Sequence, residues 1–229
     1  MGLGETTLTV CQLVVAPLRV ARYYGGAGIP AKEVPMKKPL PRWIKSGMNR
    51  RKTPKTLAVP EADSTQAEAH AFLRQYLELS LQMMAQHGKF QRPGGYWNLH
   101  DFVLQNGQPF DPAPLPDDVR YGKVKQCYTN AFNVMLEDPD RFVYVEGVGV
   151  AFIPCDHAWV WDRQHQQTVD PTWRNDWDRP PVAYLGIPLK HTYVTRAVLK
   201  KQTYGVFDDW ENHFPILTAD KADWLETEL

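Results

Sequence analysis

The stretch Gln126-Cys-Tyr-Thr-Asn-Ala-Phe-Asn-Val-Met-Leu136, which is followed by the turn signal Asp138-Pro139-Asp140, decides the fold. Its apolar residues stand at i, i+3, i+4, i+7 and i+8, the spacing of one helix face. These residues are Tyr128, Ala131, Phe132, Met135 and Leu136. We therefore predict a helix that begins near Gln126 and ends before Asp138, with Cys127 in its first turn, at the border of the apolar stripe.

The segments around this helix predict the rest of the fold. Upstream, Thr65 and Glu68 form a capping-box pattern, which predicts a core helix from Ser64 to about His87. Residues 88–122 are rich in proline and glycine and predict a long irregular crossing. Downstream, strand-like runs rich in Val, Tyr, Phe and Trp cover 141–153, 157–162, 167–173 and 182–199. Helices followed by several strands predict an α+β fold, in which the helix bearing Cys127 packs on an antiparallel β-sheet.

Charge and proline divide the 229 residues into two parts. Residues 32–55 hold nine Lys or Arg against Glu33 alone, a net charge of +8 in a chain whose formal charge is zero. They also contain four prolines and no sustained apolar period, so residues 1–60 are predicted to be a basic, proline-containing arm. Such an arm is a solvated linker, or it contacts nucleic acid or an acidic partner. Residues 61–229 are predicted to form the folded domain.

The cysteines and the apolar runs bear on location. Three cysteines are an odd number in a chain too large to depend on disulfides, which favours a reducing compartment. No apolar run approaches the ~18 residues of a membrane span, and the apolar stretch at 8–16 follows Glu5 rather than a basic segment. We therefore expect a cytoplasmic protein with neither a membrane span nor a signal peptide.

Three residues have the types and positions that nucleophilic catalysis by a thiol requires. A thiolate is favoured in the first turn of a helix, because unpaired N–H groups and the helix dipole attract negative charge there. Cys127 has this position. The thiol also needs an imidazole to accept its proton, and the imidazole needs a carboxylate to orient it. His157 and Asp170 stand in consecutive strand-like segments joined by the turn 163–166, so a hairpin can bring them together.

Cys127 at a helix start, His157-Ala-Trp and Val169-Asp-Pro-Thr-Trp173, in this order, resemble the transglutaminase-like superfamily of papain-type thiol enzymes. The similarity covers roughly residues 120–190. It implies a papain-like core and a catalytic triad of Cys127, His157 and Asp170. It also implies a cysteine-dependent amide hydrolase or acyltransferase of the peptidase, deamidase or transglutaminase type. Such an enzyme acts on a protein or peptide through a thioester, with neither a cofactor nor a metal.

Three further residues are candidates for substrate binding. Gln126 stands where many relatives have glycine or another small residue, so the donor for the oxyanion is not assigned by the resemblance. The backbone N–H of Cys127 is one candidate. The indole N–H of Trp97 is another, as in some relatives, although packing under a loop is the alternative. Trp159 is either a packing residue or a wall of the cleft beside the triad.

Two other interpretations use the same residues. In the first, the chain is a non-catalytic binding or adaptor protein, which docks through its basic arm and retains the triad residues as packing. In the second, the cluster of Cys155, Asp156 and His157 binds zinc together with Cys127 or His165. The short spacing from Cys155 to His157 in one extended segment suits a tetrahedral ion poorly, and no Cys-x-x-Cys pair accompanies it.

Overall fold

The structure of the protein is a computed structural model that describes residues 60, 65–87, 92–176 and 180–229. Except for Pro60, the predicted arm of residues 1–60 lies outside the described residues, and so does the basic segment 32–55. The fold and the candidate site are therefore those of the remainder of the chain.

Five strands form one antiparallel sheet in the order β1-β5-β2-β3-β4. The strands are β1 (Gln108–Phe110), β2 (Phe142–Val150), β3 (Pro154–Asp162), β4 (Gln167–Val169) and β5 (Ala183–Leu189). The α-helices are α2 (Gln66–His87), α3 (Leu99–Asn106), α4 (Cys127–Glu137), α5 (His191–Lys201) and α6 (Lys221–Trp224), and η1 (Pro93–Gly95) and η2 (Pro215–Leu217) are single 3₁₀ turns. The predicted α+β class with an antiparallel sheet is confirmed.

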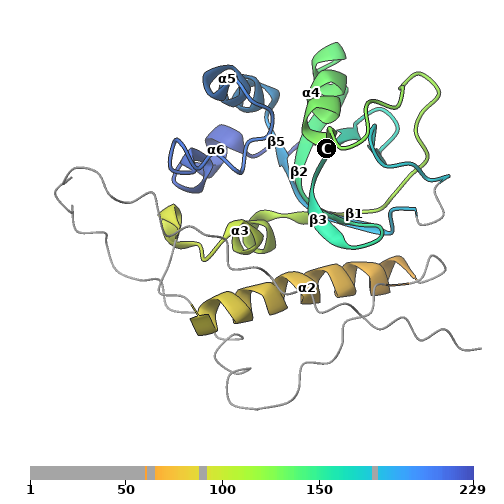
Figure 1. The fold of residues 1–229 in the computed structure, drawn as a ribbon. Helices are drawn as coiled ribbons and strands as arrows, with labels where there is room; N and C mark the ends of the chain where they lie inside the picture. The colour runs from red at the N-terminus through yellow and green to blue at the C-terminus, as the bar shows by residue number, and fades with distance from the viewer. Residues whose placement is uncertain (1–59, 61–64, 88–91, 177–179) are drawn as a thin grey trace, which may run out of the picture. The chain divides into compact units, whose positions relative to one another are not determined.

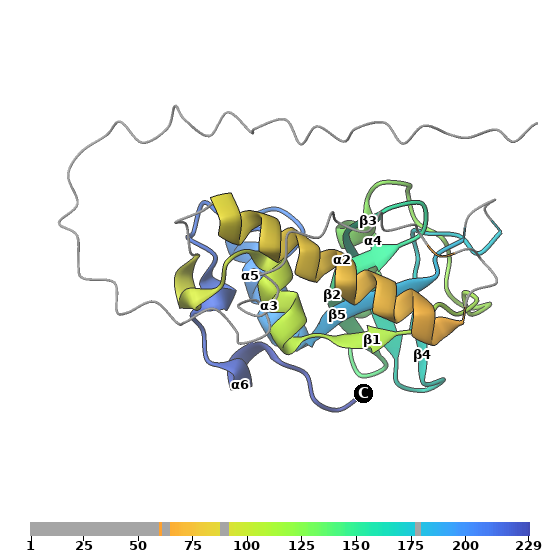
Figure 2. The same cartoon turned by 90° about the horizontal axis from the view of Figure 1, so that it is seen from below.

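Both predicted helices form close to their expected bounds. At the start of α2, Thr65 Oγ1 accepts from the backbone N–H of Glu68 at 3.3 Å, and the Glu68 carboxylate accepts from the Thr65 N–H at 3.0 Å. This is the reciprocal capping box that the sequence predicted. In α4, Ala131 and Met135 are fully buried, whereas Leu136 is 48% exposed, so the apolar stripe ends one residue early. α4 covers β2 and β3, and α2 and α3 cover β5 (Figures 1 and 2).

Two sequence predictions were wrong. The run 182–199 is not one strand: β5 ends at Leu189, and α5 follows. Tyr193, Val194 and Val198 are buried at helical spacing, and this packing overrides the strand preference of β-branched residues. The irregular crossing 88–122 contains α3 and β1. Asn98 caps α3, because its side-chain oxygen accepts from the Asp101 N–H at 2.8 Å.

The central strand β2 determines how the site is built. All nine of its residues are buried, and two of them are glycines. Gly147 pairs with His157 of β3 on one side and with Gly186 of β5 on the other, and Gly149 pairs with Tyr184 of β5. Because these glycines carry no side chain, there is room above β2 for large side chains from its two neighbours.

The apolar side chains form two clusters. The larger contains buried residues of α2, α3, α4 and α5 together with β2, β3 and β5. The smaller consists of Phe110, Val145, Trp159 and Tyr184, with Trp161, Trp173 and Leu229 packed against it. Among the described residues, no helix is long and apolar enough to cross a membrane.

Candidate active site

Cys127 is the first residue of α4 and is half-buried. The chain enters the helix through Lys125, whose φ of 65° lies in the left-handed region, and through Gln126, whose side chain makes no capping hydrogen bond. The first N–H groups of a helix have no partner within it, and they attract negative charge. The thiol thus lies in the first turn of the helix, as the sequence predicted.

His157 lies in β3, directly opposite Gly147, and its residue is 1% exposed. Its Nε2 lies 2.8 Å from Oδ2 of Asp170. The side chain of Cys127 lies close enough to raise the pKa of His157. Because Nε2 is used by Asp170, Nδ1 is the ring nitrogen that remains for the thiol. Cys127, His157 and Asp170 therefore lie together at one site, and we call these three residues the array.

Asp170 follows directly after β4 and is buried. Its Oδ1 accepts from the backbone N–H groups of Thr172 and Trp173, at 2.8 and 3.0 Å. Its Oδ2 accepts from the hydroxyl of Tyr184 at 2.8 Å, in addition to its contact with His157. Four partners fix this carboxylate, so a buried charge is well satisfied at this position.

Aromatic rings enclose the imidazole of His157. The ring of Trp173 stacks on it, with centroids 3.8 Å apart and planes 11° apart, and the ring of Tyr184 lies 6.0 Å away at 17°. Gly149 makes this layer possible: a Cβ there would lie 2.7 Å from a ring carbon of Trp173 and 2.9 Å from one of Tyr184. The layer shields the contact between His157 and Asp170 from water.

The charge of Asp170 controls the protonation of His157. Burial by itself lowers the pKa of His157, but the charge and hydrogen bond of Asp170, together with Cys127, outweigh burial and raise this pKa to about 9. The imidazole is therefore a strong enough base to hold a proton taken from the thiol.

The residues before α4, which we call the pre-helix loop (111–126), are tied to the segment that carries Asp170. The N–H of Gly122 donates to the carbonyl of Pro171 at 2.7 Å, and the amide of Asn130 in α4 donates to Thr172 Oγ1 at 2.9 Å. These two bonds fix the start of α4 against the turn after β4. They explain why a thiol and a carboxylate 43 residues apart meet at one imidazole.

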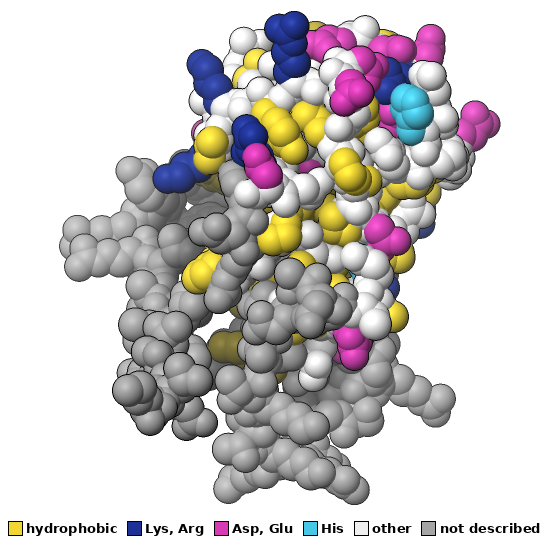
Figure 3. All heavy atoms as spheres, turned by 90° about the vertical axis from the view of Figure 1, so that its right-hand side faces the viewer, with side chains coloured by type: hydrophobic (Ala, Val, Ile, Leu, Met, Phe, Trp, Pro, Cys, Tyr) yellow, Lys and Arg dark blue, Asp and Glu magenta, His cyan; other side chains and the backbone are white. Residues whose placement is uncertain are grey.

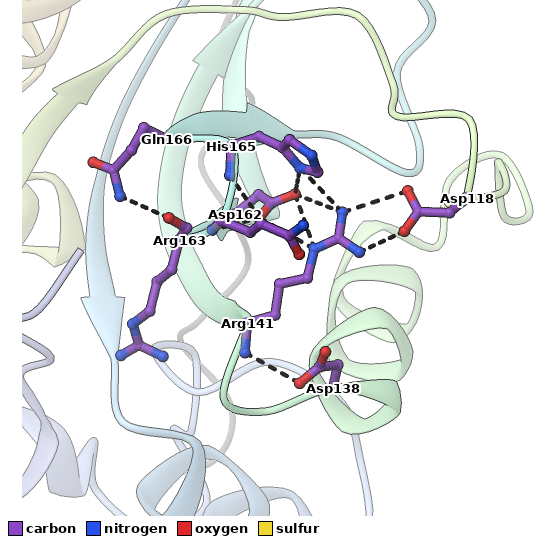
Figure 4. A network of polar contacts seen from close by, with 8 residues as sticks. Asp118, Asp138, Arg141, Asp162, Arg163, His165 and Gln166 are labelled. Carbon is purple, nitrogen blue, oxygen red and sulfur yellow. Dashed lines mark hydrogen bonds and ion pairs between the residues drawn. The ribbon is translucent and has the colours of Figure 1, made fainter.

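Arg141 anchors the pre-helix loop on the opposite side, where its guanidinium extends between Asp162 and Asp118 (Figure 4). Its Nη2 lies 2.7 Å from Oδ2 of Asp162, and its Nη1 contacts Asp118. His165 Nδ1 also lies 2.8 Å from Asp162 Oδ2. Burial raises the pKa of Asp162, but the hydrogen bonds from Arg141, His165 and the backbone outweigh it and lower this pKa to about 2. The side of the molecule in Figure 3 has acidic and basic side chains at its upper edge and hydrophobic ones in the middle.

The three predicted substrate-binding residues differ in position. Gln126 is exposed next to Cys127. Trp97 precedes α3, is half-buried, and donates its backbone N–H to Asp101 at 2.9 Å. Trp159 is 0% exposed and packs under His157, with ring centroids 6.1 Å apart. The Trp159 side chain has no exposed surface, which fits the packing alternative.

A small cavity of about 20 Å³ lies beside the array. Among its lining residues, Tyr128 follows Cys127 in the chain, Asp156 precedes His157, and Gly147 pairs with His157. His100 of α3 closes another side, and its Nε2 lies 3.4 Å from Oδ1 of Asp156. Trp97 is not among the lining residues. The part of the chain that the structure describes contains no group of three or more His, Cys, Asp or Glu placed to hold a metal ion.

Sequence reasoning missed Tyr184 and Glu146 as members of the polar framework. It placed Tyr184 in a strand but gave its hydroxyl no role. A signal for a buried Tyr184 was present, since Tyr184 and Gly186 share one face of their strand and the glycines of β2 leave room beside them. Glu146 lies among apolar residues of β2, which reads as an exposed position in an alternating strand. In the structure it is 3% exposed.

No protein-family model, no curated protein and no solved structure matches this chain.

Proposed function

We propose that this protein is a transglutaminase-like cysteine enzyme, an amide hydrolase or acyltransferase that acts on a protein or peptide through a thioester. The array of Cys127, His157 and Asp170 at the start of α4 carries the proposal. A thiol that contacts an imidazole, which in turn contacts a buried carboxylate, is the arrangement that activates a nucleophile. The four partners of Asp170 support it, because they hold the carboxylate in place to orient His157.

In the proposed reaction, His157 accepts the thiol proton and the sulfur of Cys127 attacks the amide carbonyl. The C–S bond forms, and the carbonyl electron pair moves onto oxygen. When that pair returns, the C–N bond breaks and the amine leaves with the proton that His157 donates. Water, or a second amine, then attacks the thioester while His157 accepts its proton, and the thiol is regenerated. The backbone N–H of Cys127, at the helix start, is the proposed donor to the oxyanion.

The first test compares two thiols of the same chain. The full-length protein is treated with iodoacetamide at pH 7, and the modified cysteines are quantified by peptide mass spectrometry. Cys127 should react at least ~10-fold faster than Cys155, and His157→Gln should remove the advantage. Cys155 is the internal control, because it is exposed, yet burial of its thiol and the charge of Asp156 raise its pKa to about 11. Equal rates would leave the non-catalytic binding protein as the better interpretation.

The second test separates the possible reactions of one thioester. Unfolded casein is incubated with the protein and a fluorescent primary amine. New amino termini indicate a peptidase, free ammonia without new termini indicates a deamidase, and amine incorporation indicates a transglutaminase. Cys127→Ala is the negative control and should abolish each signal. A signal that survives this substitution would show that Cys127 is not the nucleophile.

A further inference from the structure

His157 and Tyr184 hydrogen-bond to the same oxygen of Asp170. Nε2 of His157 and the hydroxyl of Tyr184 each lie 2.8 Å from Oδ2, while both backbone donors lie on Oδ1. Tyr184 comes from β5, on the far side of the central strand from His157. Its hydroxyl thus reaches across β2 to a carboxylate that a third segment supplies, which is more than packing of its ring requires.

The environment of Tyr184 keeps its hydroxyl a donor. Burial, followed by the charge of Asp170, raises the pKa of Tyr184 well above 10, so the phenol stays protonated throughout the neutral range. The ring is held between Trp159, with centroids 4.8 Å apart, and Trp173, at 5.9 Å. Its position above Gly149 leaves no space for a Cβ at that glycine. The hydroxyl therefore has a fixed direction.

We propose that Tyr184 is a positioning residue that sets how strongly Asp170 holds the proton of His157. A carboxylate oxygen that accepts a second hydrogen bond has part of its charge neutralised by the second donor. Oδ2 then attracts the imidazolium less, and His157 gives up its proton to the leaving amine more readily. The inference rests on the proposed function for its catalytic consequence, but the linkage between Tyr184 and His157 is measurable without any substrate.

In the part of the chain that the structure describes, few other titratable groups face His157. Cys127 approaches from α4 and Asp170 from the turn after β4. β2 presents glycines at the paired positions, and Trp173 covers the ring without carrying a charge. Tyr121 of the pre-helix loop acts on Tyr184 through its charge when ionised. Removal of the Tyr184 hydroxyl therefore changes one donor in an otherwise constant environment.

The test is Tyr184→Phe in the full chain, with ¹³C-labelled histidine followed by NMR from pH 5 to 11. The signal of His157 is identified among those of the seven histidines because it is missing from the spectrum of His157→Gln. The upper titration of the Cys127–His157 pair should move up by about 0.5 to 1 pH unit, a 3- to 10-fold change in the acid constant, because Oδ2 has lost a competing donor. The alkaline limb of the Cys127 alkylation rate should move by the same amount. An unchanged or lowered titration overturns the inference.

Tyr144→Phe is the matched control. Tyr144 is also a buried tyrosine whose hydroxyl donates to a buried carboxylate, Glu146, at 3.0 Å. Its removal should leave the His157 titration in place, so a shift of equal size in both variants would mean that a general loosening of the core is responsible.

A second variant covers the case in which Tyr184→Phe does not fold. Incorporation of 2,3-difluorotyrosine at position 184 keeps the ring and makes the hydroxyl a stronger donor, so the His157 titration should move down. A purely structural role of Tyr184 predicts no such opposite change, and its absence overturns the inference. If the titration moves as expected but Cys127 shows no turnover, the proposed function fails and the linkage stands. If turnover is present and the titration stays in place, the linkage alone fails.

Discussion

Two buried carboxylates in this protein, Asp170 and Glu146, have the same kinds of hydrogen-bond donor, except that only Asp170 also contacts an imidazole. Asp170 accepts from two consecutive backbone N–H groups, from the hydroxyl of Tyr184 and from His157. Glu146 accepts from the N–H groups of Val206 and Phe207, at 2.7 and 2.9 Å, and from the hydroxyl of Tyr144. Among the described residues it has no imidazole partner, and Lys201 acts on it through charge alone.

The difference decides where a proton binds. At Glu146, burial outweighs the three hydrogen bonds and raises the pKa of the carboxyl group to about 7. At Asp170 the imidazole supplies the compensating charge, and the pKa that rises is that of His157, to about 9. Backbone and tyrosine donors of the same kind thus have different results at the two positions. At Glu146 the carboxyl group itself binds the proton, whereas at Asp170 the carboxylate keeps the neighbouring imidazole protonated.

The largest expected effect comes from neutralising the two carboxylates in turn. Asp170→Asn should lower the rate of Cys127 alkylation at pH 7 by about 1,000-fold, because an amide stabilises neither the correct tautomer nor the charge of the imidazole. Glu146→Gln should lower it by less than about tenfold, since Glu146 contacts neither Cys127 nor His157. Both rates are measured by mass spectrometry on variants with native circular dichroism. Similar losses in the two folded variants would contradict the assignment of Asp170 as the orienting residue.

The second effect is on stability. The folded-state pKa of Glu146, about 7, lies above its ordinary value of 4.5, so its contribution is fully present below pH 4.5 and is lost as the pH rises through 7. This loss amounts to about 3 kcal/mol at most. Urea unfolding of the native protein between pH 4.5 and 8 should show the decline.

His157 extends the decline to higher pH. Its folded-state pKa of about 9 also lies above the ordinary 6.5, so its contribution is present below pH 6.5 and is lost as the pH rises through 9. In Glu146→Gln the fall between pH 4.5 and 7 should be absent, while the fall towards pH 9 should remain. A variant with the native slope between pH 4.5 and 7 would show that Glu146 does not titrate there.

A third buried carboxylate, Asp162, should give a pH dependence of stability in the opposite direction. Its partner Arg141 is permanently charged, and the folded-state pKa of about 2 lies below the ordinary 3.8. Its contribution is therefore present above pH 3.8 and is lost as the pH falls through 2, an effect of about 2 kcal/mol. Arg141→Met should weaken this acid dependence, because only the bonds from His165 and the backbone then remain, while the alkaline dependence should be unchanged. An unchanged acid limb in this variant would show that other carboxylates dominate it.

The sequence predicted the parts of the site that depend on local pattern. The helical spacing from Tyr128 to Met135 placed Cys127 in a first turn, and the four-residue turn after Asp162 was enough to bring Asp170 to His157. The partners of Asp170 were harder to predict. The Tyr184 hydroxyl belongs to β5, which is separated from His157 by β2, and this order of strands depends on long-range pairing. Glu146 was missed for the same reason: its donors, Val206 and Phe207, are 60 and 61 residues away.

The smallest expected effect concerns Asp118, the exposed partner of Arg141. Its side chain is 58% exposed, and Arg141 lowers its pKa. Exposed ion pairs contribute little, since water and salt screen them, so Asp118→Asn should move the melting midpoint by less than about 2 °C. Asp162→Asn, which leaves Arg141 beside a buried amide, should lower the midpoint several times more. The contact between Asp118 and Arg141 ties the pre-helix loop to the residue that precedes β2. The same melts should therefore be repeated in 1 M NaCl. The small change in melting midpoint for Asp118→Asn should vanish there, and the large change for Asp162→Asn should persist. A large, salt-resistant effect of Asp118→Asn would mean that this ion pair, and not the bonds between Gly122 and Pro171 or between Asn130 and Thr172, holds the loop that leads to Cys127.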